Sequence, residues 1–141
     1  MQSSSDGGFV IAKLDDGDDL FVRLQELAAE HGVEDGMVMW AIGMLRDVEV
    51  GYFNGKEYER HTFAEPMELL ALHGTYAARA DPRLHVHVAA AGRDHGVVGG
   101  HLFRATVNVL NEVCLRRLDT TALDRVRNPR SGLKELTVSR S

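Results

Sequence analysis

The chain has 141 residues, of which 44% are hydrophobic and 26% are charged, a balance typical of one globular domain spanning 1–141. This composition excludes a disordered protein, a collagen-like repeat and, with a single cysteine, a disulfide scaffold. Sixteen basic and twenty-one acidic residues give a formal net charge of −5, which disfavours a generally basic nucleic-acid binder.

Predicted elements begin with a short strand over residues 9–12. An acidic cluster at 15–19 follows, and its aspartates are typical of a helix start. Leucines and an alanine then recur at helical spacing until Gly32, which can end a helix. We therefore predict the main helix over about 18–31, with its acids at the positive end of the helix dipole.

Strand patterns dominate the rest of the chain. Residues 37–45 are apolar on both faces, as in a strand buried on both sides, and 48–52 alternate as in a half-exposed strand. Asn54-Gly55 is a strong hairpin turn signal. Further predicted strands cover 57–62, 67–75, 84–91 and 97–102, whereas 107–115 fits a strand or a helix. These elements predict an α+β fold with one main helix and a largely antiparallel sheet of about seven strands.

Charge is divided unevenly along the chain. Residues 1–115 carry nine Lys/Arg and eighteen Asp/Glu, a net of −9, whereas 116–141 carry seven and three, a net of +4. The basic end could contact phosphate, or it could be a solvated tail or dock on the acidic body.

The chain ends and the cellular setting are predicted from simple patterns. Residues 1–8 lack the basic and apolar regions of a signal peptide, and no apolar stretch approaches the roughly 20 residues needed to span a bilayer. We expect a cytoplasmic, reducing setting, no membrane partner, and disordered ends at about 1–7 and 138–141. Cys114 lies in an apolar run, which favours a small buried side chain over a reactive thiol.

Three of the seven histidines suggest a common site. His85 and His87 are two apart in an apolar strand, so their side chains leave the same face. If residues 93–95 form a three-residue loop, His87 lies directly opposite His101, whereas a four-residue loop turns His101 to the other face. We favour the shorter loop, because Gly96 can adopt positive φ at the end of a type I turn with a bulge. Gly99-Gly100 could add a further bulge.

Three neutral imidazoles on one face are suitable ligands for a divalent metal, most simply Zn²⁺. A fourth coordination position would then be left for water or a substrate, as in an open rather than a structural zinc site. The alternative is that His85 and His87 are hydrogen-bonded surface side chains and that His101 is unrelated to them. The spacing alone leaves both interpretations open.

Other polar residues have weaker claims to the site. His73 follows an apolar strand and could line the same cavity or be a structural histidine, and His95 should be exposed in its turn. Glu112 lies in an apolar run, so it could be a general acid/base near the metal or pair with an arginine such as Arg46.

The sequence resembles the PPC domain family, which is conserved in plants and prokaryotes and is attached to AT-hook DNA-binding segments in plants. The resemblance covers roughly residues 8–137, and its most specific part is the pair LHVH at 84–87 and GGHL at 99–102. AIGMLR at 41–46, GYF at 51–53, NEV at 111–113 and SGLKEL at 131–136 follow the family order. No Arg-Gly-Arg-Pro core of an AT-hook occurs, so the DNA function of the plant proteins does not transfer.

The resemblance implies a compact α+β domain that assembles as a homotrimer. Some prokaryotic members resemble metalloproteins, and a distant similarity to acetolactate decarboxylase also implies a zinc held by an HxH pair and a later histidine. Carried over to this sequence, the metal ligands are His85, His87 and His101. Ala89-Ala90 departs from the small polar residue and leucine that are more usual after the HxH pair.

Two functions from different classes are compatible with these patterns. The first is a trimeric metal-binding domain with a small-molecule pocket, in which Glu112 is a candidate acid/base and Arg46 a candidate anion clamp. The second is a non-catalytic interaction module that binds protein partners or, less favourably, DNA through its basic C-terminal segment. The sequence does not determine whether the protein is an enzyme.

Overall fold

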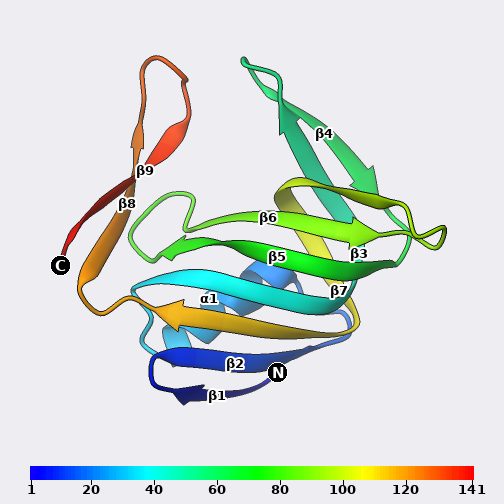
Figure 1. Ribbon diagram of the computed structural model, residues 1–141, viewed down its shortest axis with the longest axis horizontal. Helices are drawn as coiled ribbons and strands as arrows, with labels where there is room; N and C mark the ends of the chain where they lie inside the picture. The colour runs from blue at the N-terminus through cyan, green and yellow to red at the C-terminus, as the bar shows by residue number, and fades with distance from the viewer.

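The structure, a computed structural model, describes residues 1–141 and combines one helix with two antiparallel sheets (Figure 1). Seven strands form the main sheet in the order β1-β2-β7-β6-β5-β3-β4, and β8 and β9 form a separate hairpin. This confirms the predicted antiparallel sheet with a single helix. The elements are β1 (Gln2–Asp6), β2 (Phe9–Asp15), α1 (Leu20–Glu30), β3 (Asp35–Phe53), β4 (Tyr58–Phe63), β5 (Met67–Ala77), β6 (Leu84–Ala91), β7 (Val97–Arg117), β8 (Thr121–Arg127) and β9 (Lys134–Arg140).

The helix begins and ends where its capping residues allow. The Asp19 carboxylate accepts a hydrogen bond from the Val22 amide at 3.0 Å and so caps the helix N-terminus. After the last turn Gly32 adopts a φ of +62°, and the Val33 amide donates to the Ala28 carbonyl at 2.8 Å. The predicted helix of about 18–31 is therefore confirmed, with Asp19 of the acidic cluster as its N-cap.

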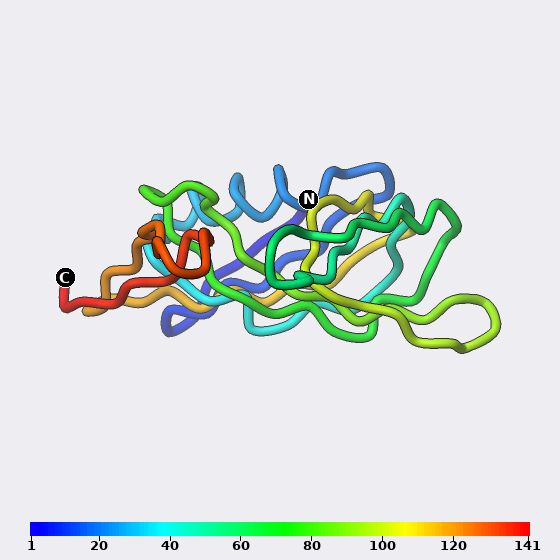
Figure 2. Tube along the Cα trace, turned by 90° about the horizontal axis from the view of Figure 1, so that it is seen from above, coloured from blue at the N-terminus to red at the C-terminus, as the bar shows by residue number.

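Helix α1 covers one face of the main sheet, and the hydrophobic core lies between them (Figure 2). The apolar stripe of α1 packs there against inward-facing residues of β2, β3, β5, β6 and β7. The buried helix residues are Leu20, Leu24, Leu27 and Ala28. The helix is too short and too polar to cross a membrane.

The two longest strands, β3 and β7, bend, and the two halves of each strand pair with different neighbours in the sheet. The first half of β3 pairs with β5 and with the second half of β7, and further along β3 Val50 and Gly51 pair with Leu102 and His101. Register shifts between Val38 and Trp40 and between Arg46 and Glu49 allow these bends. The predicted strands 37–45 and 48–52 are thus one strand, and 107–115 is strand rather than helix.

The predicted disorder at both ends is not what the structure shows. Residues 2–6 form β1, which pairs with β2 through a turn at Gly7 and Gly8. Both glycines have positive φ, +53° and +83°, as a two-residue hairpin turn requires. At the other end, β9 pairs with β8 along its whole length up to Arg140. Backbone pairing therefore orders both ends of the chain.

The face of the sheet away from α1 is apolar and uncovered within one chain. Seven large apolar side chains on β2, β3 and β5 are each at least 39% exposed: Phe9, Ile11, Met37, Met39, Trp40, Ile42 and Leu70. The prediction that residues 37–45 are buried on both faces is wrong for the single chain, because α1 covers only one of them.

We predict that Gly99→Ala destabilises the protein by about 1–3 kcal/mol, a typical cost of forcing atoms into a packed site. A Cβ at Gly99 would clash with the backbone carbonyl of Val88 on the neighbouring strand, so β6 and β7 would have to separate. Urea unfolding of the two proteins measures the difference.

Gly92→Ala in the same hairpin is the matched control, because its Cβ would meet only the end of the flexible Asp94 side chain, at 3.2 Å. Equal stability of the two variants would contradict the close approach of β6 and β7.

Candidate metal centre

His85 and His87 point away from the helix because β6 alternates strictly between its two faces. Leu84, Val86 and Val88 are buried in the core, whereas His85 is half-buried and His87 is exposed on the opposite face. The alternation of apolar and polar side chains in this segment thus fixes which way the two imidazoles project.

The β6–β7 hairpin brings His101 to the same face. His87 pairs with His101, and the pairing continues without a register shift to Ala91 and Val97. The Gly92 amide donates to the Gly96 carbonyl at 3.0 Å, so the loop has the three residues predicted. The positive φ falls on His95, at +64°, and not on Gly96 as expected. The further bulge that Gly99-Gly100 could have added is absent from the β6–β7 pairing.

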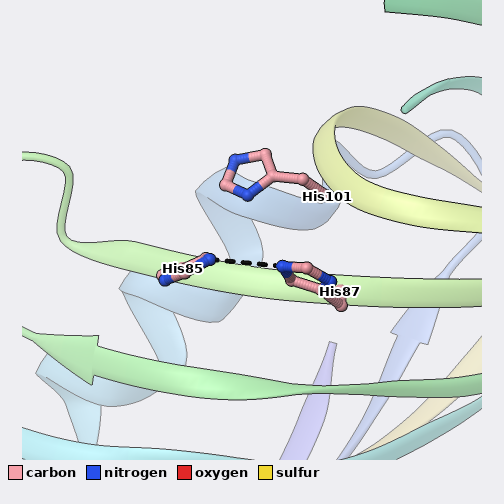
Figure 3. A group of neighbouring side chains, drawn as sticks. All are labelled: His85, His87 and His101. Carbon is pink, nitrogen blue, oxygen red and sulfur yellow. Dashed lines mark hydrogen bonds between the residues drawn. The ribbon is translucent and has the colours of Figure 1, made fainter. Parts of the chain in front are cut away.

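The three rings converge on a common point (Figure 3). One ring nitrogen from each of His85, His87 and His101 lies within 4.8 Å of the other two. The Nε2 atoms of His85 and His87 are 3.3 Å apart. Two nitrogens bound to zinc at 2.0–2.1 Å with a tetrahedral angle are about 3.3–3.4 Å apart, so this pair already has ligand spacing.

His101 provides an independent test of whether a metal fits. Its Nδ1 is buried and has no hydrogen-bond partner, although buried ring nitrogens are normally satisfied. In Figure 3 the ring leans over His85 and His87 with one nitrogen turned toward them. A divalent cation among the three rings would satisfy this nitrogen, so the donor set fits a metal of the zinc type.

Burial and nearby positive charges keep His85 and His101 neutral, which is the form of histidine that binds metals. Desolvation is the main cause that lowers the pKa of His101 to about 4, with contributions from His85, His87, Arg60 and Arg125. Desolvation also lowers the pKa of His85, helped by the positive charge of Arg125 and by His87. At neutral pH these two rings therefore carry free lone pairs.

Aromatic side chains form a wall beside His101. The ring centroids of Tyr58 and Phe103 lie 4.8 and 4.5 Å from that of His101. The Arg60 guanidinium stacks over the Phe103 ring, 3.7 Å from the ring centroid. These contacts hold the His101 ring in place and exclude water from one side of it.

A cavity of about 430 Å³ opens beside the histidines, between the main sheet and the β8–β9 hairpin. His85, His101, Phe103 and Arg125 line it together with residues of the hairpin loop and β9. A larger cavity of about 820 Å³ lies by the β6–β7 turn, and none of the three histidines lines it. The smaller cavity is therefore the one that a ligand of the metal centre would enter.

The two predicted catalytic residues do not line this cavity. Glu112 is exposed on β7, across from Lys13 of β2. Arg46 donates to the Asp16 carboxylate at 2.8 Å and to the Asn108 side chain at 2.9 Å, so it pairs with Asp16 instead of Glu112. The structure thus brings the three histidines together without either residue.

The remaining histidines lie in different surroundings. His73 is exposed and is the cross-strand partner of His87, so a row of histidines crosses β5, β6 and β7. His31 contacts the Ser3 hydroxyl at 2.9 Å, and His61 packs against Phe63. His95 is exposed in its turn, as predicted.

Arg125 is a candidate site residue that the sequence analysis placed in the basic C-terminal segment. It is only 8% exposed and lines the cavity beside His85. Its inward position follows from β8, where Leu123 and Arg125 are buried while Asp124 and Val126 are exposed. The only sequence signal for the burial of Arg125 was that it lies two residues after the apolar Leu123 in a short segment.

Comparison with known proteins shows one family. The sequence profile of the Plants and Prokaryotes Conserved (PCC) domain matches residues 1–119, and this is the family that the sequence resembles. No curated protein sequence shows significant similarity to the chain.

Several solved structures share the fold. A metal-containing protein from Archaeoglobus fulgidus is 33% identical over 93% of this chain and 94% of its own, with a TM-score of 0.82. A plant- and prokaryote-conserved protein from Pyrococcus horikoshii is 24% identical over 95% and 93%, with a TM-score of 0.80. A proposed DNA-binding protein from Bacteroides thetaiotaomicron is 24% identical over 96% of both chains, with a TM-score of 0.86.

After metal is removed with a chelator, we predict that the free energy of unfolding falls as the pH is lowered from about 6.5 to about 4. Between these pH values His101 is protonated in the unfolded chain and neutral in the folded chain, because its pKa in the folded chain is about 4. His85 acts in the same direction.

Urea unfolding at several pH values measures this dependence. His101→Gln should show a smaller fall over the same window, since the depressed imidazole is gone. A variant as pH-dependent as the original chain would contradict the assignment to His101.

Proposed function

The chain belongs to the Plants and Prokaryotes Conserved domain family, and we propose that it is a homotrimeric domain that binds one divalent metal ion, zinc, per chain. The ligands would be His85, His87 and His101, and a small-molecule cavity lined by His85 and His101 adjoins them. The convergence of three ring nitrogens within 4.8 Å, one of them buried and without a partner, is the observation that carries this proposal.

The donor set supports zinc or a similar borderline ion. Three imidazoles without a thiolate or carboxylate are typical of sites that keep a fourth position free. A metal bound in this way can polarise a carbonyl oxygen or acidify a bound water. The relative from Archaeoglobus fulgidus, which is 33% identical, is described as metal-containing, and this agrees with the proposal.

The chain's own residues would orient and shield a ligand. Tyr58 and Phe103 cover one side of His101, and the cavity of about 430 Å³ admits a small molecule. Glu112 and Arg46 lie outside this cavity in one chain. Their proposed acid/base and anion-binding roles therefore require that a neighbouring copy supplies them.

We predict that the protein, purified without a histidine tag, contains about one zinc ion per chain and that His87→Ala loses it. The substitution removes one of three ligands, and the remaining pair cannot hold an ion with two open positions as tightly. Elemental analysis after dialysis measures the metal content.

His95→Ala is the matched control, because His95 is exposed in the hairpin turn and belongs to no ligand group. Absence of any transition metal from the unsubstituted protein would sink the proposed metal site, and so would full metal content in His87→Ala.

The uncovered apolar face of the sheet supports self-association. The side chains of Phe9 on β2 and of Trp40 and Ile42 on β3 are 39–46% exposed on this face. A patch of neighbouring apolar residues on one sheet face is typical of a subunit interface. The family resemblance supports a trimer, and the apolar face is the surface that we assign to its interface.

We predict a solution mass of three chains and a shift toward one chain in Ile42→Glu. The new carboxylate would have to be buried in the interface without a partner. Val22→Glu is the matched control, since Val22 on α1 is exposed to a similar degree, 48% against 46%.

Light scattering coupled to size exclusion measures both masses. A monomeric unsubstituted protein would refute the trimer, and an unchanged trimer in Ile42→Glu would refute the assigned face.

The alternative function, an interaction module that binds protein partners or DNA, has weaker support. Arg117 pairs with Asp119 and Lys134 with Asp81, each at 2.6 Å, while Arg125 is buried. Arg116 donates to the Gly7 carbonyl and packs over Phe9. Only Arg127, Arg130 and Arg140 of the basic segment remain for phosphate, which favours the metal-binding function over DNA binding.

A further inference from the structure

Arg125 is held beside the candidate metal centre by neutral groups. Its Nε donates to the Pro82 carbonyl at 3.0 Å, and its Nη2 donates to the Thr75 hydroxyl at 2.7 Å. Thr75 is the cross-strand partner of His85. The guanidinium is thereby fixed next to His85 at the wall of the cavity of about 430 Å³.

The positive charge of Arg125 has no counter-ion in the chain. No carboxylate lies within ion-pairing distance of it, although the side chain is only 8% exposed. Buried charges in proteins are normally paired or bind a ligand. A carboxylate on Glu135 also lines the cavity, but it accepts hydrogen bonds from Asn128 and Ser131.

Lys134 adds a second cation to the cavity wall, and its charge is balanced by Asp81 at 2.6 Å. The unbalanced positive charge therefore has two sources. One is Arg125, and the other is the divalent ion of the proposed function, because three neutral imidazoles add no negative charge to it. A cavity with this balance favours an anion.

We propose that this cavity binds a small oxyanion, a carboxylate or a phosphate group, between Arg125 and the open position above the three histidines. The inference rests on the proposed function, because the second contact of the anion is the metal. Nη1 of Arg125 has no acceptor in the chain and is free to donate to an oxygen of the ligand.

The rest of the wall limits the body of the ligand. Phe103, Leu133 and Leu136 give the cavity an apolar side, which suits a short hydrocarbon part attached to the anionic group. Arg125 lies on β8, and Leu133 and Leu136 line the same cavity from the hairpin loop and β9. The anion site therefore depends on the β8–β9 hairpin.

Calorimetric titration of the zinc-loaded full chain with oxalate, and separately with inorganic phosphate, tests the inference. We expect at least one of the two anions to bind, and Arg125→Gln to weaken that binding by about 10-fold or more, since a charge-assisted hydrogen bond is lost. The stronger of the two anions identifies the class of ligand. Arg127→Gln removes the same charge from an exposed position on β8 and should bind as the unsubstituted chain does.

Two further measurements keep the outcomes distinct. Zinc content is measured before and after each titration, so that failure of the metal site is separated from failure of anion binding. Arg125→Lys retains the charge but not the planar fork, and it should bind several-fold more weakly than the unsubstituted chain even if Arg125→Gln does not fold.

Binding of neither anion to a fully zinc-loaded chain would overturn the inference while leaving the metal site intact. Equal binding by the unsubstituted chain and both Arg125 variants would overturn it as well. Loss of zinc from the unsubstituted chain would instead overturn the proposed function, and the inference with it.

Discussion

The pairing register of β6 and β7 is the constraint on which the candidate site depends. The three-residue reversal closed by Gly92 and Gly96 sets His87 opposite His101. Because side chains alternate along a strand, one more residue in the loop would move His101 to the core side of the sheet. The backbone hydrogen bonds of a short hairpin therefore decide whether three imidazoles can share a ligand.

Burial then gives these imidazoles their chemical character. The rings lie on a sheet face that is partly covered by Tyr58, Phe103 and the β8–β9 hairpin. Desolvation disfavours protonation, and Arg125 adds a positive charge instead of a carboxylate that would stabilise an imidazolium. Neutral imidazoles are the form that would bind the proposed metal, and the charge of Arg125 is the basis of the proposed anion contact.

The two faces of the main sheet have different roles. One face packs against α1 and forms the hydrophobic core, which provides the rigid support for β6 and β7. The other face carries the histidines and also the exposed apolar residues of β2 and β3. Because the candidate site and the proposed subunit interface share one face of the sheet, the surfaces for assembly and for ligand binding lie close together.

The sequence by itself determined the elements whose signals are local. The capped helix, the alternating strand with His85 and His87, and the short loop before His101 were all predictable, because capping, period-two alternation and turn length act over a few residues. Only the tertiary structure decided the pairing of β1 with β2 and of β9 with β8, the partner of Arg46, and the burial of Arg125. These depend on contacts between segments far apart in the chain, and residue types at short spacing carry no information about such contacts.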